Sequence, residues 1–195
     1  MQQKIKDIIN QSIQVKQSLA TDEALVKRIE EVAFEIADTF QKGNKVLFCG
    51  NGGSAADAQH LAAEFTGRFY SDRRPLPAEA LHVNTSFLTA VANDYNYDEV
   101  YQRAIKAHGK PGDVLCAFST SGNSRNCVLA MQQAMLQQMK VIAFTGASGG
   151  QMKNHCHYLL NVASTDTPRI QETHILIGHI ICQLVEEMLM ERKFI

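Results

Sequence analysis

The stretch Cys49-Gly50-Asn51-Gly52-Gly53-Ser54-Ala55-Ala56-Asp57-Ala58-Gln59-His60 decides how the chain folds. Strand-forming residues 45–48 precede it, and an alanine-rich run with helical spacing, 55–65, follows it. The glycines therefore fall at a turn from a strand into a helix. Glycine tolerates positive φ and close approach to a ligand, and the free N–H groups that open a helix favour anions. We expect this turn to bind phosphate.

The helix after the turn carries His60 and Glu64 four residues apart, hence on one face. An imidazole and a carboxylate there can share a metal or transfer protons, although a solvated pair has the same spacing. The last helix carries Gln171 and His179 on neighbouring parts of one face among apolar residues. Polar groups on an apolar helix need partners or a function, which favours a site.

A second polar turn, Ser119-Thr120-Ser121-Gly122-Asn123-Ser124, follows the buried strand predicted at 113–118. Its four hydroxyls and the N–H groups of the next helix can bind phosphate without a cation. The alternative is an ordinary helix cap, which needs only one such side chain. The number of hydroxyls favours the phosphate site.

Alternating strands and helices predict a three-layer α/β sandwich, in which helices flank a central, mainly parallel sheet. We expect one domain over 1–195, with a helical extension over 1–43 whose second helix has Thr21 as N-cap and ends at Gln41. Residues 93–97 should be irregular. Further strands are predicted at 79–83, 139–144 and 157–162, and further helices at 85–92, 98–108, 125–138 and 168–192.

Composition excludes several classes of function. Nineteen basic and twenty acidic residues give a net charge of −1, so direct nucleic-acid binding through a basic face is not expected. Five widely spaced cysteines without a CxxC pair predict reduced thiols in the cytoplasm. No signal peptide or membrane span is expected. The first turn lacks the third glycine of a dinucleotide site and the lysine of a P-loop, so we expect no nucleotide cofactor.

Three motifs, at residues 50–64, 119–124 and 169–179, together resemble the phosphoheptose isomerase family of sugar isomerase (SIS) domain proteins. The likeness runs nearly end to end and includes Thr66-Gly67-Arg68, Asn93-Asp94 and Thr145-Gly146. It implies a flavodoxin-like, doubly wound fold. It also implies interconversion of sedoheptulose 7-phosphate and D-glycero-D-manno-heptose 7-phosphate for bacterial heptose biosynthesis, in lipopolysaccharide core or capsule.

The resemblance also implies site residues and an assembly. Glu64 would be the base and His179 the acid of an enediol mechanism, beside one zinc ion per subunit. The family is a homotetramer with active sites between subunits. The implied zinc ligands are His60, Glu64, Gln171 and His179; the implied substrate contacts are Asn51, Gly52, Gly53, Glu64, Asn93, Asp94, Ser119, Thr120, Ser121, Ser124 and Gln171.

One departure from the family pattern is Pro168, which stands where a small residue often precedes the Arg-Ile-Gln-Glu motif. Proline is tolerated at a helix start, so its effect is expected in the loop 164–167. Two other classes of function remain open: a related SIS scaffold that binds the replication initiator DnaA, and a regulatory domain that senses a phosphosugar. The acid–base residues at positions 60, 64 and 179 favour the enzyme.

Overall fold

Five parallel strands form one sheet at the centre of the computed structural model, which describes all residues, 1–195. Their order across the sheet is β2-β1-β3-β4-β5, the flavodoxin-like arrangement. The prediction of a mainly parallel central sheet is therefore confirmed. The strands are β1 (Val46–Gly50), β2 (Ala78–Ala80), β3 (Val114–Ser119), β4 (Lys140–Thr145) and β5 (Tyr158–Asn161).

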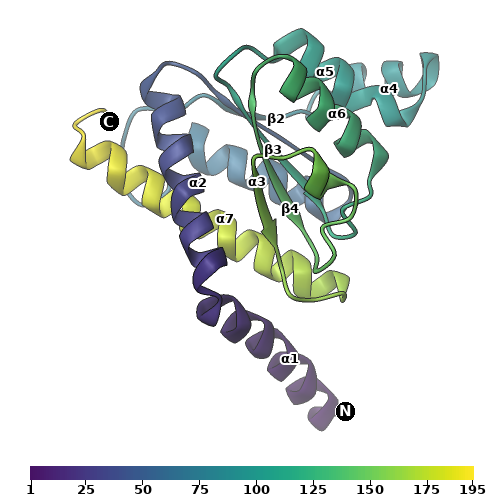
Figure 1. Cartoon of the computed structure of the whole chain (residues 1–195), viewed down its shortest axis with the longest axis vertical. Coiled ribbons are helices and arrows are strands. Elements are labelled where there is room, and N and C mark those ends of the chain that lie inside the picture. The colour runs from purple at the N-terminus through teal and green to yellow at the C-terminus, as the bar shows by residue number, and fades with distance from the viewer.

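Helices cover both faces of this sheet and complete the three layers (Figure 1). Successive strand residues point to opposite faces, so Val46 and Phe48 enter one core while Leu47 and Cys49 enter the other. The first core contains α2 (Glu23–Gln41), α3 (Gly53–Thr66) and α7 (Thr167–Glu191). The second contains α4 (Thr85–Asp94), α5 (Val100–His108) and α6 (Arg125–Leu136); two short 3₁₀ helices, η1 (Tyr97–Glu99) and η2 (Met152–Asn154), complete the chain.

The helix α7 is the longest element and is apolar enough to resemble a membrane span by length and composition alone. Half of its most apolar 18-residue window is buried inside the fold. Ile170, Ile177 and Val185 belong to the core on one side of the sheet. In this fold α7 is therefore a core helix.

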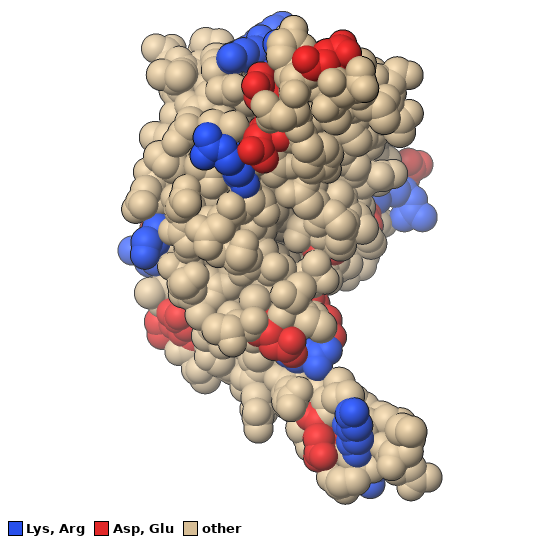
Figure 2. All heavy atoms as spheres, turned by 90° about the vertical axis from the view of Figure 1, so that its right-hand side faces the viewer, with Lys and Arg blue, Asp and Glu red and all other residues tan.

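The N-terminal helix α1 (Gln2–Thr21) projects from the body and has no buried residue (Figure 1). Ile5 and Ile9 are about half exposed, at 51% and 53%. Charges of both signs are interspersed on the face in Figure 2, without a broad basic patch there. The predicted N-cap of the next helix, Thr21, is wrong: Thr21 ends α1, and Asp22 caps α2 by accepting a hydrogen bond from the Leu25 N–H at 3.0 Å.

The segment 93–97, predicted as irregular, is partly regular. Asn93 and Asp94 form the end of α4, and Tyr97 opens η1. The turn-forming residues had suggested an earlier stop, but the helical hydrogen bonds continue to the end of α4, where the Tyr95 N–H donates to the Val91 carbonyl oxygen at 3.0 Å. The other elements agree with the prediction to within a few residues.

The sheet order indicates where a ligand is expected to bind. From β1 the chain passes to β2 on one side, whereas β3 lies on the other. Ligands in such sheets bind where neighbouring connections diverge, outside the carboxyl ends of the strands. The turns after β1 and β3 are the two polar turns of the sequence, so they lie side by side.

Candidate active site

The turn after β1 needs glycine at two positions for different reasons. Gly52 has φ 57°, in the left-handed region. A Cβ on Gly50 would lie 2.6 Å from the Ser54 carbonyl oxygen. The chain thus enters α3 through a turn tight enough to bring its first N–H groups to the crevice, as a phosphate site requires.

Hydroxyl groups gather in the turn after β3. The Ser119 Oγ lies 2.8 Å from the Ser124 Oγ and 3.3 Å from the Ser121 Oγ. Gly122, with φ 66°, reverses the chain between them, and Thr120 lies next to Ser119. Three of the four hydroxyls therefore converge at the start of α6, next to the glycine turn. This clustering supports the predicted phosphate role.

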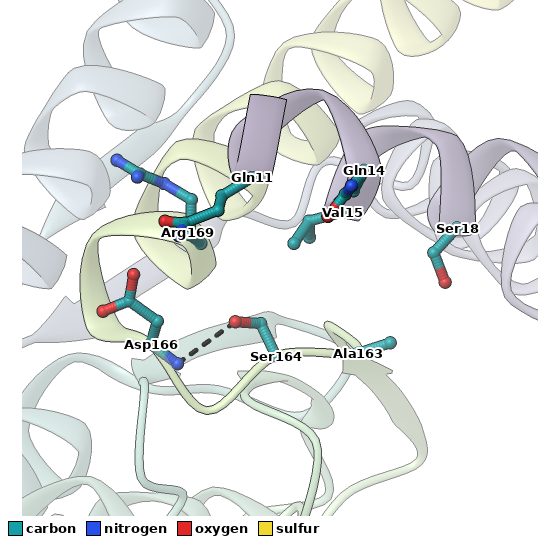
Figure 3. A pocket seen from close by; sticks show the side chains of 8 residues that line it. All are labelled: Gln11, Gln14, Val15, Ser18, Ala163, Ser164, Asp166 and Arg169. Carbon is teal, nitrogen blue, oxygen red and sulfur yellow. Dashed lines mark hydrogen bonds between the residues drawn. The ribbon is translucent and has the colours of Figure 1, made fainter. Parts of the chain in front are cut away.

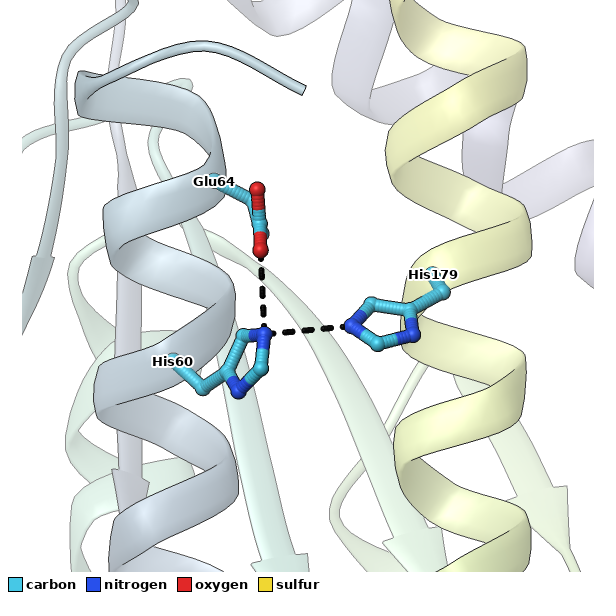
Figure 4. Close-up of side chains that lie close together, drawn as sticks. All are labelled: His60, Glu64 and His179. Carbon is cyan, nitrogen blue, oxygen red and sulfur yellow. Dashed lines mark hydrogen bonds and ion pairs between the residues drawn. The ribbon is translucent and has the colours of Figure 1, made fainter. Parts of the chain in front are cut away.

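The two histidines and the glutamate predicted as metal ligands lie together (Figure 4). The His60 Nε2 lies 3.0 Å from the Glu64 Oε1 and 3.2 Å from the His179 Nε2. All three ligand atoms lie within 4.8 Å of one another. His60 and Glu64 come from one face of α3, while His179 reaches them from α7.

This donor set fits a catalytic zinc ion. Two imidazoles and one carboxylate, with a further position for water or substrate, are a known catalytic zinc arrangement. The two Nε2 atoms face each other, and only one of them can donate a proton to the other. A cation between the three groups would satisfy both nitrogens at once.

Gln171, the fourth predicted ligand, lies nearer the glycine turn. A Cβ on Gly53 would lie 2.6 Å from the Gln171 Nε2. Gly53 stands seven residues before His60, which is about 10 Å along a helix. In this arrangement Gln171 contacts the first turn of α3, so its role as a zinc ligand stays a prediction.

Beside His60 and Glu64 the surface is hollowed. A depression of about 620 Å³ lies along α3, lined by Ala56, Gln59, His60, Ala63, Glu64, Gly67 and Arg68. The His60 and Glu64 side chains are 49% and 24% exposed. A small solute can therefore reach both groups.

Asn93 and Asp94, also predicted to contact substrate, are exposed at the end of α4, and the Asn93 amide donates to the Asp94 carboxylate at 2.9 Å. They are connected to the glycine turn through Tyr97, whose hydroxyl donates to the Asn51 Oδ1 at 3.2 Å. Tyr97 belongs to none of the motifs found in the sequence. A tyrosine in a turn-rich segment carries no signal for a contact 46 positions away.

Asp57 is another titratable group without an assigned role. It lies one turn before His60, and its Oδ2 is buried without a hydrogen-bond partner. Burial raises the pKa of its carboxyl to about 6, although nearby His60 lowers it. Its position within the motif at residues 50–64 was the only signal in the sequence.

A second hollow, of about 530 Å³, lies between α1 and the loop before α7 (Figure 3). The Asp166 N–H there donates to the Ser164 Oγ at 3.1 Å, and Arg169 pairs with Glu172. Pro168 occupies the first turn of α7, where proline is tolerated. The loop 164–167, which precedes Pro168, thus lines this hollow. None of the predicted site residues lies in its lining.

The chain is similar to several known proteins. The model of the SIS domain family matches residues 10–146. The chain is 49% identical to a phosphoheptose isomerase of Aneurinibacillus thermoaerophilus, over 98% of this chain and 96% of that protein. It is 48% identical to one of Clostridium acetobutylicum, over 95% and 94%.

Solved structures show the same fold. The phosphoheptose isomerase GmhA of Neisseria gonorrhoeae superposes with a TM-score of 0.90 at 41% identity, covering 95% of this chain and 98% of that one. A phosphoheptose isomerase of Francisella tularensis gives 0.91 at 36% identity, covering 95% and 97%. The similarity therefore extends over nearly the whole length of each protein.

Proposed function

The chain belongs to the phosphoheptose isomerase family of SIS-domain proteins, and we propose that it interconverts sedoheptulose 7-phosphate and D-glycero-D-manno-heptose 7-phosphate. The observation that carries this proposal is the convergence of His60, Glu64 and His179 from two helices. An aldose–ketose isomerase needs a base and an acid beside an anchored sugar. The cluster of His60, Glu64 and His179 offers both, about 10 Å along α3 from the glycine turn.

Glu64 serves as the base. It removes the proton from C1 of the ketose while His179, acting as the acid, protonates the carbonyl oxygen at C2, which gives a cis-enediol. Glu64 then returns the proton to C2, and the C1 hydroxyl loses its proton. These two steps give the aldose, so atoms and charge balance. General acid–base catalysis of this kind contributes roughly 10²- to 10⁴-fold.

The hydroxyl-rich turn from Ser119 to Ser124 holds the phosphate in this proposal, with Asn51, Gly52, Gly53, Asn93, Asp94 and Gln171 along the sugar. The phosphate takes no part in the chemistry. Its binding energy fixes the reacting carbons against Glu64, which supplies orientation rather than a chemical step.

A zinc ion is proposed for His60, Glu64 and His179, with Gln171 as the fourth ligand. When bound, zinc polarises the carbonyl and diol oxygens of the sugar. The donor chemistry supports this assignment, because the Nε2 atoms of His60 and His179 and a carboxylate oxygen of Glu64 all lie within 4.8 Å of one another. Loss of activity on chelation, and its return with added zinc, is the expected result.

A homotetramer in the cytoplasm is proposed as the working form. The half-exposed isoleucines of α1 support an assembly, since the apolar face of a projecting helix is stabilised by a partner surface. The product would enter heptose biosynthesis for lipopolysaccharide or capsule.

The decisive experiment is turnover. Purified protein is incubated with sedoheptulose 7-phosphate, with and without zinc, and the aldose is followed by NMR. Appearance of the heptose phosphate supports the proposal. Binding of the sugar without turnover at any zinc level would instead indicate a phosphosugar sensor, and a pull-down with DnaA tests the scaffold alternative.

A further inference from the structure

The Asn51 side chain, at the end of β1, is held from two sides. Its Nδ2 donates to the Asn126 Oδ1 at 2.9 Å, and the Asn126 Nδ2 donates back to the Asn51 Oδ1 at 2.9 Å. The Tyr97 hydroxyl donates to the same Oδ1 at 3.2 Å. Three hydrogen bonds fix the plane of this amide, which leaves it little freedom to turn towards a ligand.

The two partners come from different parts of the crevice. Asn126 is the second residue of α6, directly after the hydroxyl-rich turn, and is 3% exposed. Its Oδ1 also accepts from the Cys127 N–H at 2.9 Å, which fixes the start of that helix. Tyr97 stands three residues after Asp94. Asn51 therefore joins the glycine turn, the hydroxyl-rich turn and the segment at 93–94.

A further bond supports the glycine turn from behind. The hydroxyl of Tyr101, a fully buried residue of α5, donates to the Gly50 carbonyl oxygen at 2.5 Å. The backbone at Gly50 and the side chain at Asn51 are thus both anchored to the layer of helices α4 to α6. The turn is held in place before any ligand arrives.

Holding a binding turn in place has an energetic consequence. A loop that must order on binding loses conformational entropy, which weakens affinity, whereas a preorganised loop does not. The amide pair is also costly to break, since removing Asn126 leaves the partly buried Asn51 Nδ2 without its hydrogen-bond partner. Substrate affinity should therefore depend on Asn126 even if the substrate never contacts it.

We propose that Asn126 and Tyr97 are positioning residues that act through Asn51 to hold the glycine turn, the hydroxyl-rich turn and the segment at 93–94 at a fixed separation. This rests on the proposed function, because the ligand is the phosphate end of the sugar. We call these hydrogen bonds among Asn51, Asn126 and Tyr97 the clasp. The proposed chemistry takes place at Glu64 and His179, which the clasp does not contact, so its loss weakens substrate binding while a bound sugar still reacts.

The test compares two Asn→Ala variants. Asn126→Ala removes both hydrogen bonds between Asn126 and Asn51, together with the one that the Cys127 N–H donates, and leaves the Tyr97 bond in place. Asn44→Ala removes two hydrogen bonds, to the Pro111 carbonyl at 3.0 Å and the Asp113 Oδ1 at 3.1 Å, at the opposite end of β1. Both variants lose stability, but only Asn126→Ala should raise the KM for sedoheptulose 7-phosphate, by about tenfold for two lost hydrogen bonds, with kcat within threefold of wild type.

A KM for Asn126→Ala within twofold of wild type, or an equal rise for Asn44→Ala, would overturn the proposal. If Asn126→Ala does not fold, Tyr97→Phe decides. It removes a single hydroxyl from a half-exposed side chain, and the expected rise in KM is about threefold; an unchanged KM would refute the clasp.

A failure of the proposed isomerase function can be distinguished from a failure of the positioning role of Asn126. If wild-type protein shows no turnover, titration calorimetry with sedoheptulose 7-phosphate replaces the kinetic assay. Tenfold weaker binding by Asn126→Ala than by wild type and Asn44→Ala then supports the clasp without the isomerase, and equal binding by all three proteins refutes it.

Discussion

Replacing His174 by Gln should remove a specific part of the pH dependence of folding. His174 is fully buried on α7, with its ring against Phe118 and Phe144. Its Nε2 lies 3.1 Å from the Thr145 carbonyl oxygen, which can only accept, so Nε2 carries the proton. The Nδ1 has no partner. Burial lowers the pKa of this imidazole to about 4, although the hydrogen bond to Thr145 raises it.

Protonation of His174 favours the unfolded state. The unfolded chain binds a proton at His174 near its ordinary pKa of 6.5, while the folded chain binds it only near 4. Between these values the unfolded state holds more protons, so the free energy of unfolding decreases as the pH falls. The difference between pKa values of 6.5 and about 4 can lower the free energy of unfolding by about 3.4 kcal/mol in full. About 2 kcal/mol of this is lost by pH 5.

The measurement is urea unfolding followed by circular dichroism at pH 7.5 and pH 5, at one protein concentration. Glutamine can still donate to the Thr145 carbonyl and does not titrate, and all other ionisable groups are shared. The stability advantage of wild type over His174→Gln should shrink by about 2 kcal/mol between the two pH values. A difference that stays constant within about 0.5 kcal/mol would refute the reasoning.

Three further predictions concern the site and its support. Glu64→Gln should reduce kcat by 10² to 10⁴ or so, because it removes the base, while thermal stability and affinity for inorganic phosphate stay at wild-type values; near-normal turnover contradicts the assignment. Glu186→Gln should lower the free energy of unfolding in urea by about 3 kcal/mol, since it leaves the buried Arg73 guanidinium without its anion. Asp38→Asn, in the more exposed pair with Arg192, should lower it by less than about 1 kcal/mol. Gly50→Ala should weaken substrate binding and lower the melting temperature together, because its Cβ would lie 2.6 Å from the Ser54 carbonyl oxygen; unchanged values would show that the turn relaxes freely.

The parts of the site that depend on local pattern could be predicted from the sequence. The glycine turn, the hydroxyl-rich turn and the stacking of His60 on Glu64 follow from spacing alone, and the structure has all three. The contact of His60 with His179 spans 119 positions. No periodicity encodes such a distance, so only the family resemblance suggested it. The N-cap failed for a local reason: Thr21 and Asp22 are both good caps, and the structure uses Asp22.

The supporting groups were not predictable, because each is a single polar residue whose partner lies far away in the chain. Arg73 and Glu186 form a buried pair 113 positions apart, and Arg73 also donates to the Glu64 and Phe65 carbonyls at the end of α3. In the sequence both read as surface charges on a loop and a helix. Their burial appears only once α7 packs beside α3.

The same packing explains why one helix can serve both ends of the proposed substrate. The helix α3 begins at the glycine turn and carries His60 seven residues later, about 10 Å along its axis. The phosphate lies at the far end of a seven-carbon chain from the carbons that exchange their proton, so the site needs two fixed points separated by most of an extended sugar. Hydrogen bonds between Asn51 and Asn126 join the start of α3 to the hydroxyl-rich turn that holds the phosphate in the proposal, which fixes the first point. The hydrogen bond from Arg73 to the Glu64 carbonyl fixes the second. Neither set of hydrogen bonds reaches the Glu64 carboxylate or the His179 ring. The rigid helix α3 between them nevertheless sets the distance over which the sugar must be held.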